Sequence, residues 1–150
     1  MSDIALVLKD NCFDLNIVDN DLEADKGLET AVALSLFTNK RVEEEELPDL
    51  ETDRQGWWGD MFPQVDLDKI GSRLWTIERS KRTTETLRRS EELCKEALNW
   101  MLEDGLASAI KVNSEYNSDK HLIINIEISR PEKESERFSV LWDEQKLRRE

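Results

Sequence analysis

The segment from Thr83 to Gly105 constrains the fold more than any other part of this 150-residue sequence. Its apolar and small residues recur three or four positions apart: Leu87, Ser90, Cys94, Ala97 and Met101, with Leu93, Leu98 and Leu102 widening the stripe. This period predicts an amphipathic helix of about 20 residues, roughly 30 Å long. Thr83 or Thr84 suits its N-terminal cap, and Gly105 suits its end. A helix with one long apolar face needs a second layer to cover that face.

Alternating residues after the helix predict that second layer. Apolar side chains fall on every second position over Ile110–Tyr116, Leu122–Ile128 and Phe138–Trp142, except that Ser114 takes one such position in the first run. Turn-forming residues separate the three runs, at 117–120 and 131–136. Period-two alternation between turns is typical of strands, so we expect an antiparallel meander.

The N-terminal third predicts smaller elements. Ile4–Leu8 and Phe13–Ile17 alternate around the turn-prone pair Asp10-Asn11, which favours a β-hairpin. Helical spacing predicts one helix from about Asp25 to Phe37. A second stripe, formed by Leu67, Ile70, Leu74 and Ile77 and broken by Gly71, predicts one or two short helices ending near Glu78.

Together these elements predict a single α+β domain over residues 1–150. An antiparallel sheet, made of the N-terminal hairpin and the C-terminal meander, would pack against the long central helix and the shorter helices. A chain of this length can bury about two thirds of its unfolded surface, which is enough for one core. Seven acidic residues and Pro48 between Val42 and Arg54 predict a solvated acidic loop at about 40–56. A tail is expected at 143–150.

Two glycine- and tryptophan-containing motifs stand apart from this periodic pattern. The first is Gly56-Trp57-Trp58-Gly59-Asp60, and the second is Gly71-Ser72-Arg73-Leu74-Trp75. Glycines on both sides of a tryptophan pair disfavour regular structure, so two large rings lie in a segment suited to contact. Either the protein's own core or a partner protein must cover them.

These motifs, followed by the basic stretch Arg79, Lys81 and Arg82 and the long helix, resemble the small baseplate wedge proteins of Mu-like contractile-tailed phages. The resemblance covers roughly Asp3 to Trp142 and is most specific from Gly56 to Trp75. Related families are the lysozyme-like baseplate wedge proteins of other contractile tails and of type VI secretion. Those relatives carry a Glu-Pro-Arg or Glu-Arg motif shortly before the equivalent of Gly71. This sequence lacks that motif, so contacts ascribed to it cannot be transferred.

The resemblance implies a non-catalytic structural subunit of a phage tail baseplate. Such a subunit would be present in the virion and, during assembly, in the bacterial cytoplasm. Its implied partners are larger wedge proteins and the tail sheath protein, whose assembly it would help to nucleate through an open strand edge. Arg137–Trp142 and Ile4–Leu8 are the candidate edges, because strands near chain ends often lie at the edge of a sheet.

The residues expected at the wedge interface come from the two glycine- and tryptophan-containing motifs, since aromatic and arginine residues dominate interface energetics. They are Gly56, Trp57, Trp58, Gly59, Asp60, Gly71, Arg73 and Trp75. Arg73 has an alternative role, in which it pairs with Asp60 or Asp66 inside the subunit.

Composition argues against several other functions. A formal net charge of −13 disfavours binding to nucleic acid or to an anionic membrane. The one histidine, His121, has no neighbouring cysteine or second histidine, so neither a metal site nor a nucleophile pair is expected. Cys12 and Cys94 are expected to be reduced packing residues. No cofactor and no small-molecule substrate are predicted.

Four alternatives remain open at this stage. A peptidoglycan-cleaving enzyme would need two carboxylates in a cleft, and Asp60 and Glu78 flank the aromatic residues. A free-standing protein-binding module would act without a baseplate. Within the assembly hypothesis, the acidic loop could bind a basic partner. The basic cluster, formed by Arg79, Lys81, Arg82, Arg88 and Arg89, could likewise bind an acidic protein.

Overall fold

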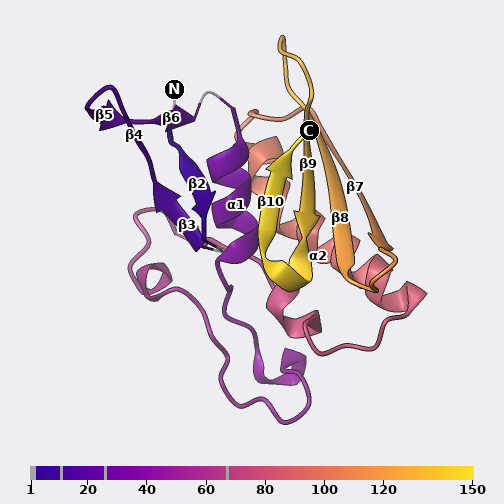
Figure 1. Cartoon of the computed structure of the whole chain (residues 1–150). Coiled ribbons are helices and arrows are strands. Elements are labelled where there is room, and N and C mark those ends of the chain that lie inside the picture. The colour runs from indigo at the N-terminus through magenta and orange to yellow at the C-terminus, as the bar shows by residue number, and fades with distance from the viewer. Residues whose placement is uncertain (1–2, 11, 26, 67) are drawn as a thin grey trace.

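A computed structural model describes residues 3–10, 12–25, 27–66 and 68–150. Asn11 of the predicted turn and Leu67 of the predicted stripe therefore lie outside the described residues. The chain folds into an antiparallel sheet with the order β10-β9-β8-β7, crossed by the long helix α2 (Figure 1). The strands are β7 (Ala109–Tyr116), β8 (Leu122–Ser129), β9 (Glu136–Leu141) and β10 (Lys146–Arg149). This α+β architecture agrees with the prediction.

Helix α2 (Thr84–Glu103) confirms the predicted long helix, including both of its ends. The Thr83 hydroxyl caps the first turn by accepting the backbone N–H of Thr86 at 3.2 Å. Gly105 adopts φ +71° just beyond the last turn, a conformation that favours glycine. The buried side of α2 is the predicted stripe, consisting of Ser90, Leu93, Cys94, Ala97, Leu98 and Met101.

The sheet confirms the predicted meander and adds a fourth strand. Every second residue of β8 is buried, from Leu122 to Ile128, so one face packs against the helices. Residues 146–149, which the sequence analysis assigned to a tail, form β10 and pair antiparallel with β9. Strand β9 is thus enclosed between β8 and β10, and Arg137–Trp142 is not an edge. Trp142 begins the short helix η4 (Trp142–Glu144).

The predicted N-terminal hairpin is confirmed, but it forms a sheet of its own. Strand β2 (Leu6–Lys9) pairs with β3 (Cys12–Leu15). Two shorter ladders flank this hairpin: β1 (Asp3–Ile4) with β6 (Ala24–Asp25), and β4 (Ile17–Val18) with β5 (Asp21–Leu22). The Phe13 ring lies 5.5 Å from that of Phe37, which stacks on Trp142 at 5.8 Å. These three rings attach the hairpin to the main body.

Helix α1 (Glu29–Phe37) confirms the first predicted helix but begins four residues later than expected. Asp25 is the reason, because its carboxylate accepts the backbone N–H groups of Gly27 and Thr30, both at 2.8 Å. The side chain of Asp25 thereby satisfies donors at the start of the helix instead of joining it. Val32, Ala33 and Leu36 of α1 contribute to the core.

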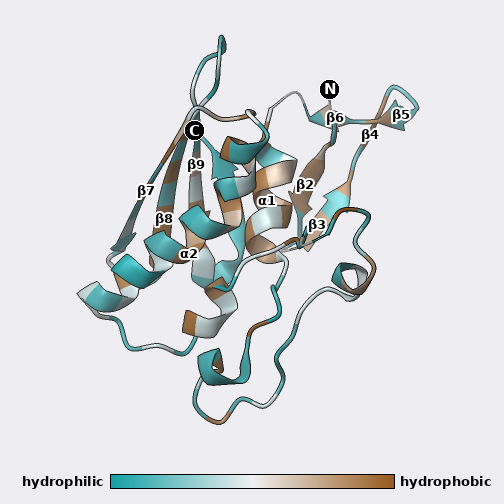
Figure 2. Ribbon diagram, turned by 180° about the vertical axis from the view of Figure 1, so that it is seen from behind, coloured by the Kyte–Doolittle hydropathy of each residue, from teal (hydrophilic) through white to brown (hydrophobic). Residues whose placement is uncertain are grey.

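Residues 38–83 connect the two helices without extended regular structure. They contain three short 3₁₀ helices: η1 (Glu44–Glu46), η2 (Trp58–Met61) and η3 (Leu74–Ile77). The expected short helices before Glu78 are thus reduced to η3. Figure 2 shows this long connection extending away from the helices and the sheet. Across the described ranges, no helix has the length and apolar character that a transmembrane span requires.

Candidate functional site

The connection between α1 and α2 exposes an unusual group of large apolar side chains. We call residues 56–65 the aromatic segment. Its exposed apolar members are Trp57, Trp58, Met61, Phe62 and Val65, with Trp58 75% and Phe62 79% exposed. Clustered exposed aromatic residues mark an interaction site more often than scattered single residues do.

Two glycines shape the backbone of the aromatic segment. Gly56 adopts φ +110°, and an added Cβ there would lie 2.7 Å from the Cβ of Arg41. The Trp57 ring folds over Gly59, where a Cβ would come within 2.2 Å of the indole. The rings of Trp57 and Trp58 contact each other, with centroids 5.4 Å apart. Both glycines are therefore needed for the observed arrangement of the tryptophan pair.

Asp60 connects the aromatic segment to the second motif. Its Oδ1 accepts the backbone N–H of Ile70 at 3.1 Å, next to Gly71. Its Oδ2 is buried and finds no hydrogen-bond partner among the described residues. Asp60 therefore stabilises the loop through an internal hydrogen bond. Its carboxylate is directed into the protein and not into solvent.

The second motif packs inside the subunit. Gly71 adopts φ +105°, and a Cβ would lie 2.4 Å from the carbonyl oxygen of Thr38. Trp75 is only 6% exposed, and its indole N–H donates to the carbonyl oxygen of Lys40 at 2.9 Å. Gly71 and Trp75, which were expected at the wedge interface, therefore lie in the core behind the aromatic segment.

Arg73 is engaged by two carboxylates of its own chain. Its Nε donates to Glu96 at 3.1 Å, and its guanidinium also pairs with Glu46 of the acidic loop. The hydrogen bond that Arg73 donates to the Glu96 carboxylate is the main cause that raises the pKa of Arg73. The intramolecular alternative is thus the one observed, although its partners are Glu46 and Glu96 instead of Asp60 or Asp66.

The same contacts fold part of the acidic loop back onto the body. Besides the Glu46 contact, Arg54 pairs with Glu43, and Val42 is buried. Most other side chains of the loop are exposed. In the basic cluster, Arg89 pairs with Glu92 at 3.6 Å.

Sequence reasoning missed the exposed apolar residues beyond the tryptophan pair. Met61, Phe62 and Val65 follow no helical or strand period, and Pro63 interrupts them. Apolar residues without a period cannot form one buried face of an element. That irregularity is the signal that could have added them to the candidate site.

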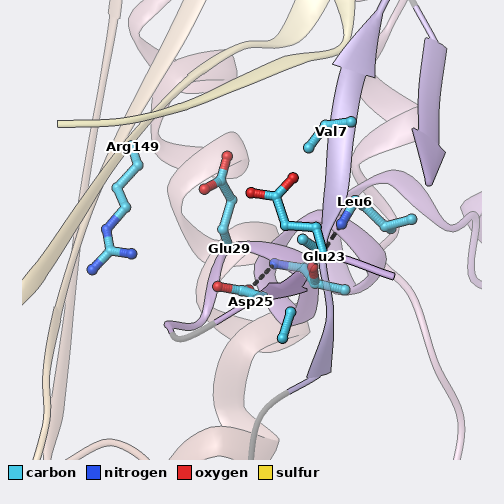
Figure 3. Close-up of a pocket in the computed structure, with 9 residues that line it drawn as sticks. Leu6, Val7, Glu23, Asp25, Glu29 and Arg149 are labelled. Atoms are coloured by element: carbon cyan, nitrogen blue, oxygen red, sulfur yellow. Dashed lines mark hydrogen bonds between the residues drawn. The ribbon is translucent and has the colours of Figure 1, made fainter. Parts of the chain in front are cut away.

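The geometry gives no support to the carboxylate pair of the enzyme alternative. Glu78 is exposed at the end of η3, whereas Asp60 is engaged by Ile70. Neither residue lines the cavity of about 360 Å³ between β2 and Arg149 (Figure 3), nor the smaller one of about 130 Å³ on the sheet. Among the residues with described positions, no three histidine, cysteine or acidic side chains could hold a metal ion together.

The α+β fold and the aromatic segment define a small protein with a cluster of exposed large apolar side chains. The chain belongs to the family described as phage protein GP46, whose sequence profile matches residues 28–135. It is 37% identical to "Baseplate protein gp46" of Escherichia phage Mu, over 88% of this chain and 90% of that protein. It is 33% identical to "Mu-like prophage FluMu protein gp46" of Haemophilus influenzae, over 95% and 98% of the two chains. The resemblance to a Mu-like baseplate family is thereby confirmed.

Proposed function

We propose that this chain is a non-catalytic structural subunit of a contractile phage tail baseplate. The name of the phage Mu relative supports the baseplate role. The exposed aromatic segment carries the proposal, because a tail subunit that functions by assembly needs a surface that only its neighbour covers. On this proposal the protein acts in the tail of the virion, after synthesis in the bacterial cytoplasm.

The partner proposed for the aromatic segment is a larger baseplate wedge protein. Trp57 and Trp58 would insert into it, while Gly56, Gly59 and Asp60 maintain the loop that presents them. Gly71, Arg73 and Trp75 would act from behind. Gly71 and Trp75 pack against Thr38 and Lys40, which follow α1, and Arg73 binds Glu96 of α2.

A further part of the proposal concerns the tail sheath. An open strand edge offers unpaired N–H and C=O groups to an incoming strand, which would help to nucleate the first sheath ring. Of the two candidate edges, Arg137–Trp142 is enclosed between neighbouring strands. Ile4–Leu8 remains from the sequence candidates, and the outer sides of β10 and β7, the two end strands of the main sheet, are further candidates for this role.

Co-expression tests the wedge contact. The chain is produced together with the larger wedge protein of the same phage or prophage, and the mixture is analysed by size-exclusion chromatography with light scattering. We expect a defined complex with wild type and its loss with the double variant Trp57→Ala/Trp58→Ala. Leu106→Ala, which trims an exposed apolar residue just beyond the C-terminal end of α2, serves as the control and keeps the complex.

Two results would contradict the proposal. If wild-type protein elutes alone although circular dichroism shows that it is folded, the larger wedge protein is not its partner. If the double variant still forms the complex, the aromatic segment is not the contact surface. Sheath protein added to the co-expression tests the sheath contact separately, since it should copurify if an open strand edge binds it.

A further inference from the structure

The N-terminal hairpin exposes a second group of apolar side chains, distinct from the aromatic segment. We call residues 15–22 the hairpin tip. Its exposed apolar side chains are Leu15, Ile17, Val18 and Leu22, and Ile17 is 70% exposed. Figure 1 shows β4 and β5 on the opposite side of the molecule from β7. The hairpin tip is thus on the opposite side of the molecule from the β7 edge of the main sheet.

The hairpin tip is well ordered without a partner. Ile17 pairs with Leu22 across the β4–β5 ladder, and directly paired residues of an antiparallel ladder share a face. Asp19 and Asn20 form the two-residue turn with φ 51° and 64°, the conformation that tight hairpins favour. Two hydrogen bonds between Asn16 and Glu23, at 2.8 and 2.9 Å, close the base of the tip. Its apolar surface is therefore preorganised for contact.

Acidic residues surround this apolar surface. Residues 3–25 contain seven acidic residues and a single lysine, Lys9. The Lys9 ammonium is already used locally, since it donates to the carbonyl oxygen of Leu15 at 2.9 Å and lies 3.9 Å from Asp14. Residues 14–23, which form the tip and its base, thus contain four acidic residues and no lysine or arginine.

An acidic cavity lies at the base of the hairpin. Its volume is about 360 Å³, and its charged lining residues are Glu23, Asp25, Glu29 and Arg149 (Figure 3). The Asp25 carboxylate already accepts hydrogen bonds from two backbone N–H groups. The Arg149 guanidinium lies 3.3 Å from the Glu136 carboxylate. The Glu29 carboxylate makes no hydrogen bond within the described part of the chain. Burial and the nearby Asp25 raise the pKa of Glu29, so a cation entering the cavity would favour its ionised form.

We propose that the hairpin tip and this acidic cavity form one docking surface for a protein whose apolar face is bordered by lysine and arginine. A second copy of this chain is a poor occupant, because two acidic borders and two net charges of −13 would repel each other. Nucleic acid and anionic lipid are repelled for the same reason. A basic border on the partner matches the acidic residues, and one lysine or arginine side chain enters the cavity beside Glu29.

A peptide of alternating leucine and lysine serves as a defined probe, and its twin of alternating leucine and glutamate serves as the comparison. Each is titrated into the isotopically labelled protein at low ionic strength, and amide chemical shifts are followed by NMR. The leucine–lysine peptide is expected to bind saturably, with shifts concentrated in residues 12–25 and around Glu29. The leucine–glutamate peptide is expected not to bind.

Variants separate the apolar from the charged contribution. Ile17→Ser/Leu22→Ser should weaken binding about tenfold, because apolar anchors carry most interface energy. Glu29→Gln should weaken it about threefold and reduce its dependence on salt. Trp57→Ala/Trp58→Ala is the control that removes exposed apolar surface elsewhere, and its binding to the peptide should equal that of wild type. This control also makes the result independent of the proposed wedge contact.

Three results would overturn the proposal. The two peptides could bind equally well, which would exclude a role for charge. The shifts could concentrate in the acidic loop at 43–53, which would place cation binding elsewhere. Finally, wild type could associate with itself in about 1 M salt, where charges are screened beyond roughly 3 Å, and lose this association in Ile17→Ser/Leu22→Ser. The occupant would then be a second copy.

Discussion

Replacement of Gly71 by alanine tests how closely the chain packs behind the aromatic segment. The residue has φ +105°, and a Cβ would approach the Thr38 carbonyl oxygen to 2.4 Å. The clash is with backbone, which is itself held by hydrogen bonds between Ser72 and both Thr38 and Lys40. We expect Gly71→Ala to lower the free energy of unfolding by about 3 kcal/mol. Urea unfolding followed by circular dichroism measures this loss.

Gly105→Ala is the matched control for that variant. Gly105 also has positive φ, at +71°, but nothing lies within 4 Å of an added Cβ. Gly105→Ala should therefore lower the free energy of unfolding only by the penalty for a side chain at positive φ, about 1 kcal/mol. If the two variants were destabilised equally, close packing at Gly71 would have no energetic role.

The two cysteines should differ sharply in reactivity. Cys12 is exposed, whereas Cys94 is completely buried in α2, and burial raises the pKa of its thiol to about 12. Because the thiolate is the reactive form, a disulfide reagent at pH 8 should label one thiol in the folded protein. Two thiols should react in denaturant. Cys12→Ser should abolish the rapid reaction, and fast labelling of that variant would contradict the burial of Cys94.

At the scale of elements, β10 is the strand whose contribution most needs measurement. Leu147 is buried and pairs with Val140, while Arg148 beside it is exposed. Leu147→Ala should cost about 2 kcal/mol of stability through lost burial and a residual cavity. Arg148→Ala should change stability by less than about 0.5 kcal/mol. Thermal unfolding of both variants checks this, and a neutral effect of Leu147→Ala would support a loosely attached tail.

The elements that were predicted correctly are those in which the spacing of apolar residues along the element identifies its buried face. The stripe of α2 and the alternation of β8 each repeat over several turns or residue pairs, so local sequence determines them. Strand β10 has one buried apolar residue, Leu147, and its pairing depends on β9. Likewise, no local signal tells whether the N-terminal hairpin joins the main sheet, because that depends on packing through Phe37 and Trp142.

The candidate site was predictable only in part for a similar reason. Composition identified Trp57 and Trp58 correctly as residues in an irregular segment, and they are exposed. The same composition could not separate them from Trp75, whose burial follows from the distant backbone carbonyl of Lys40. Nor could it pair Arg73 with Glu46 and Glu96, which lie far from it in sequence.

On the scale of the whole molecule, stability should vary with pH in two opposite ways. Burial, with Asp25 as the next cause, raises the pKa of Glu29 above 4.5, so the folded state binds this proton more readily than the unfolded state. Stability should therefore rise as the pH falls from 7 toward 4.5. The direction follows because the folded state takes up this proton at a higher pH than the unfolded state does.

Glu96 produces the opposite change at lower pH. Burial opposes its ionisation, but Arg73 and Lys40 outweigh burial, so the pKa of Glu96 lies below 4.5. The stabilisation from ionised Glu96 is complete above pH 4.5 and is lost as the pH falls through its folded pKa. We therefore expect the highest thermal midpoint between about pH 4.5 and 6, with a steep decline below.

Two variants assign each limb of that pH profile to its residue. Glu29→Gln should raise the midpoint at pH 7 and flatten the rise toward pH 4.5, because no charge has to be buried beside Asp25. Glu96→Gln should lower the midpoint at pH 7 and flatten the acid limb, since Arg73 then loses its main carboxylate partner. Differential scanning calorimetry from pH 3 to 8 measures both limbs. Parallel profiles for wild type and Glu96→Gln would show that the contact joining η3 to α2 contributes nothing to the acid sensitivity of the fold.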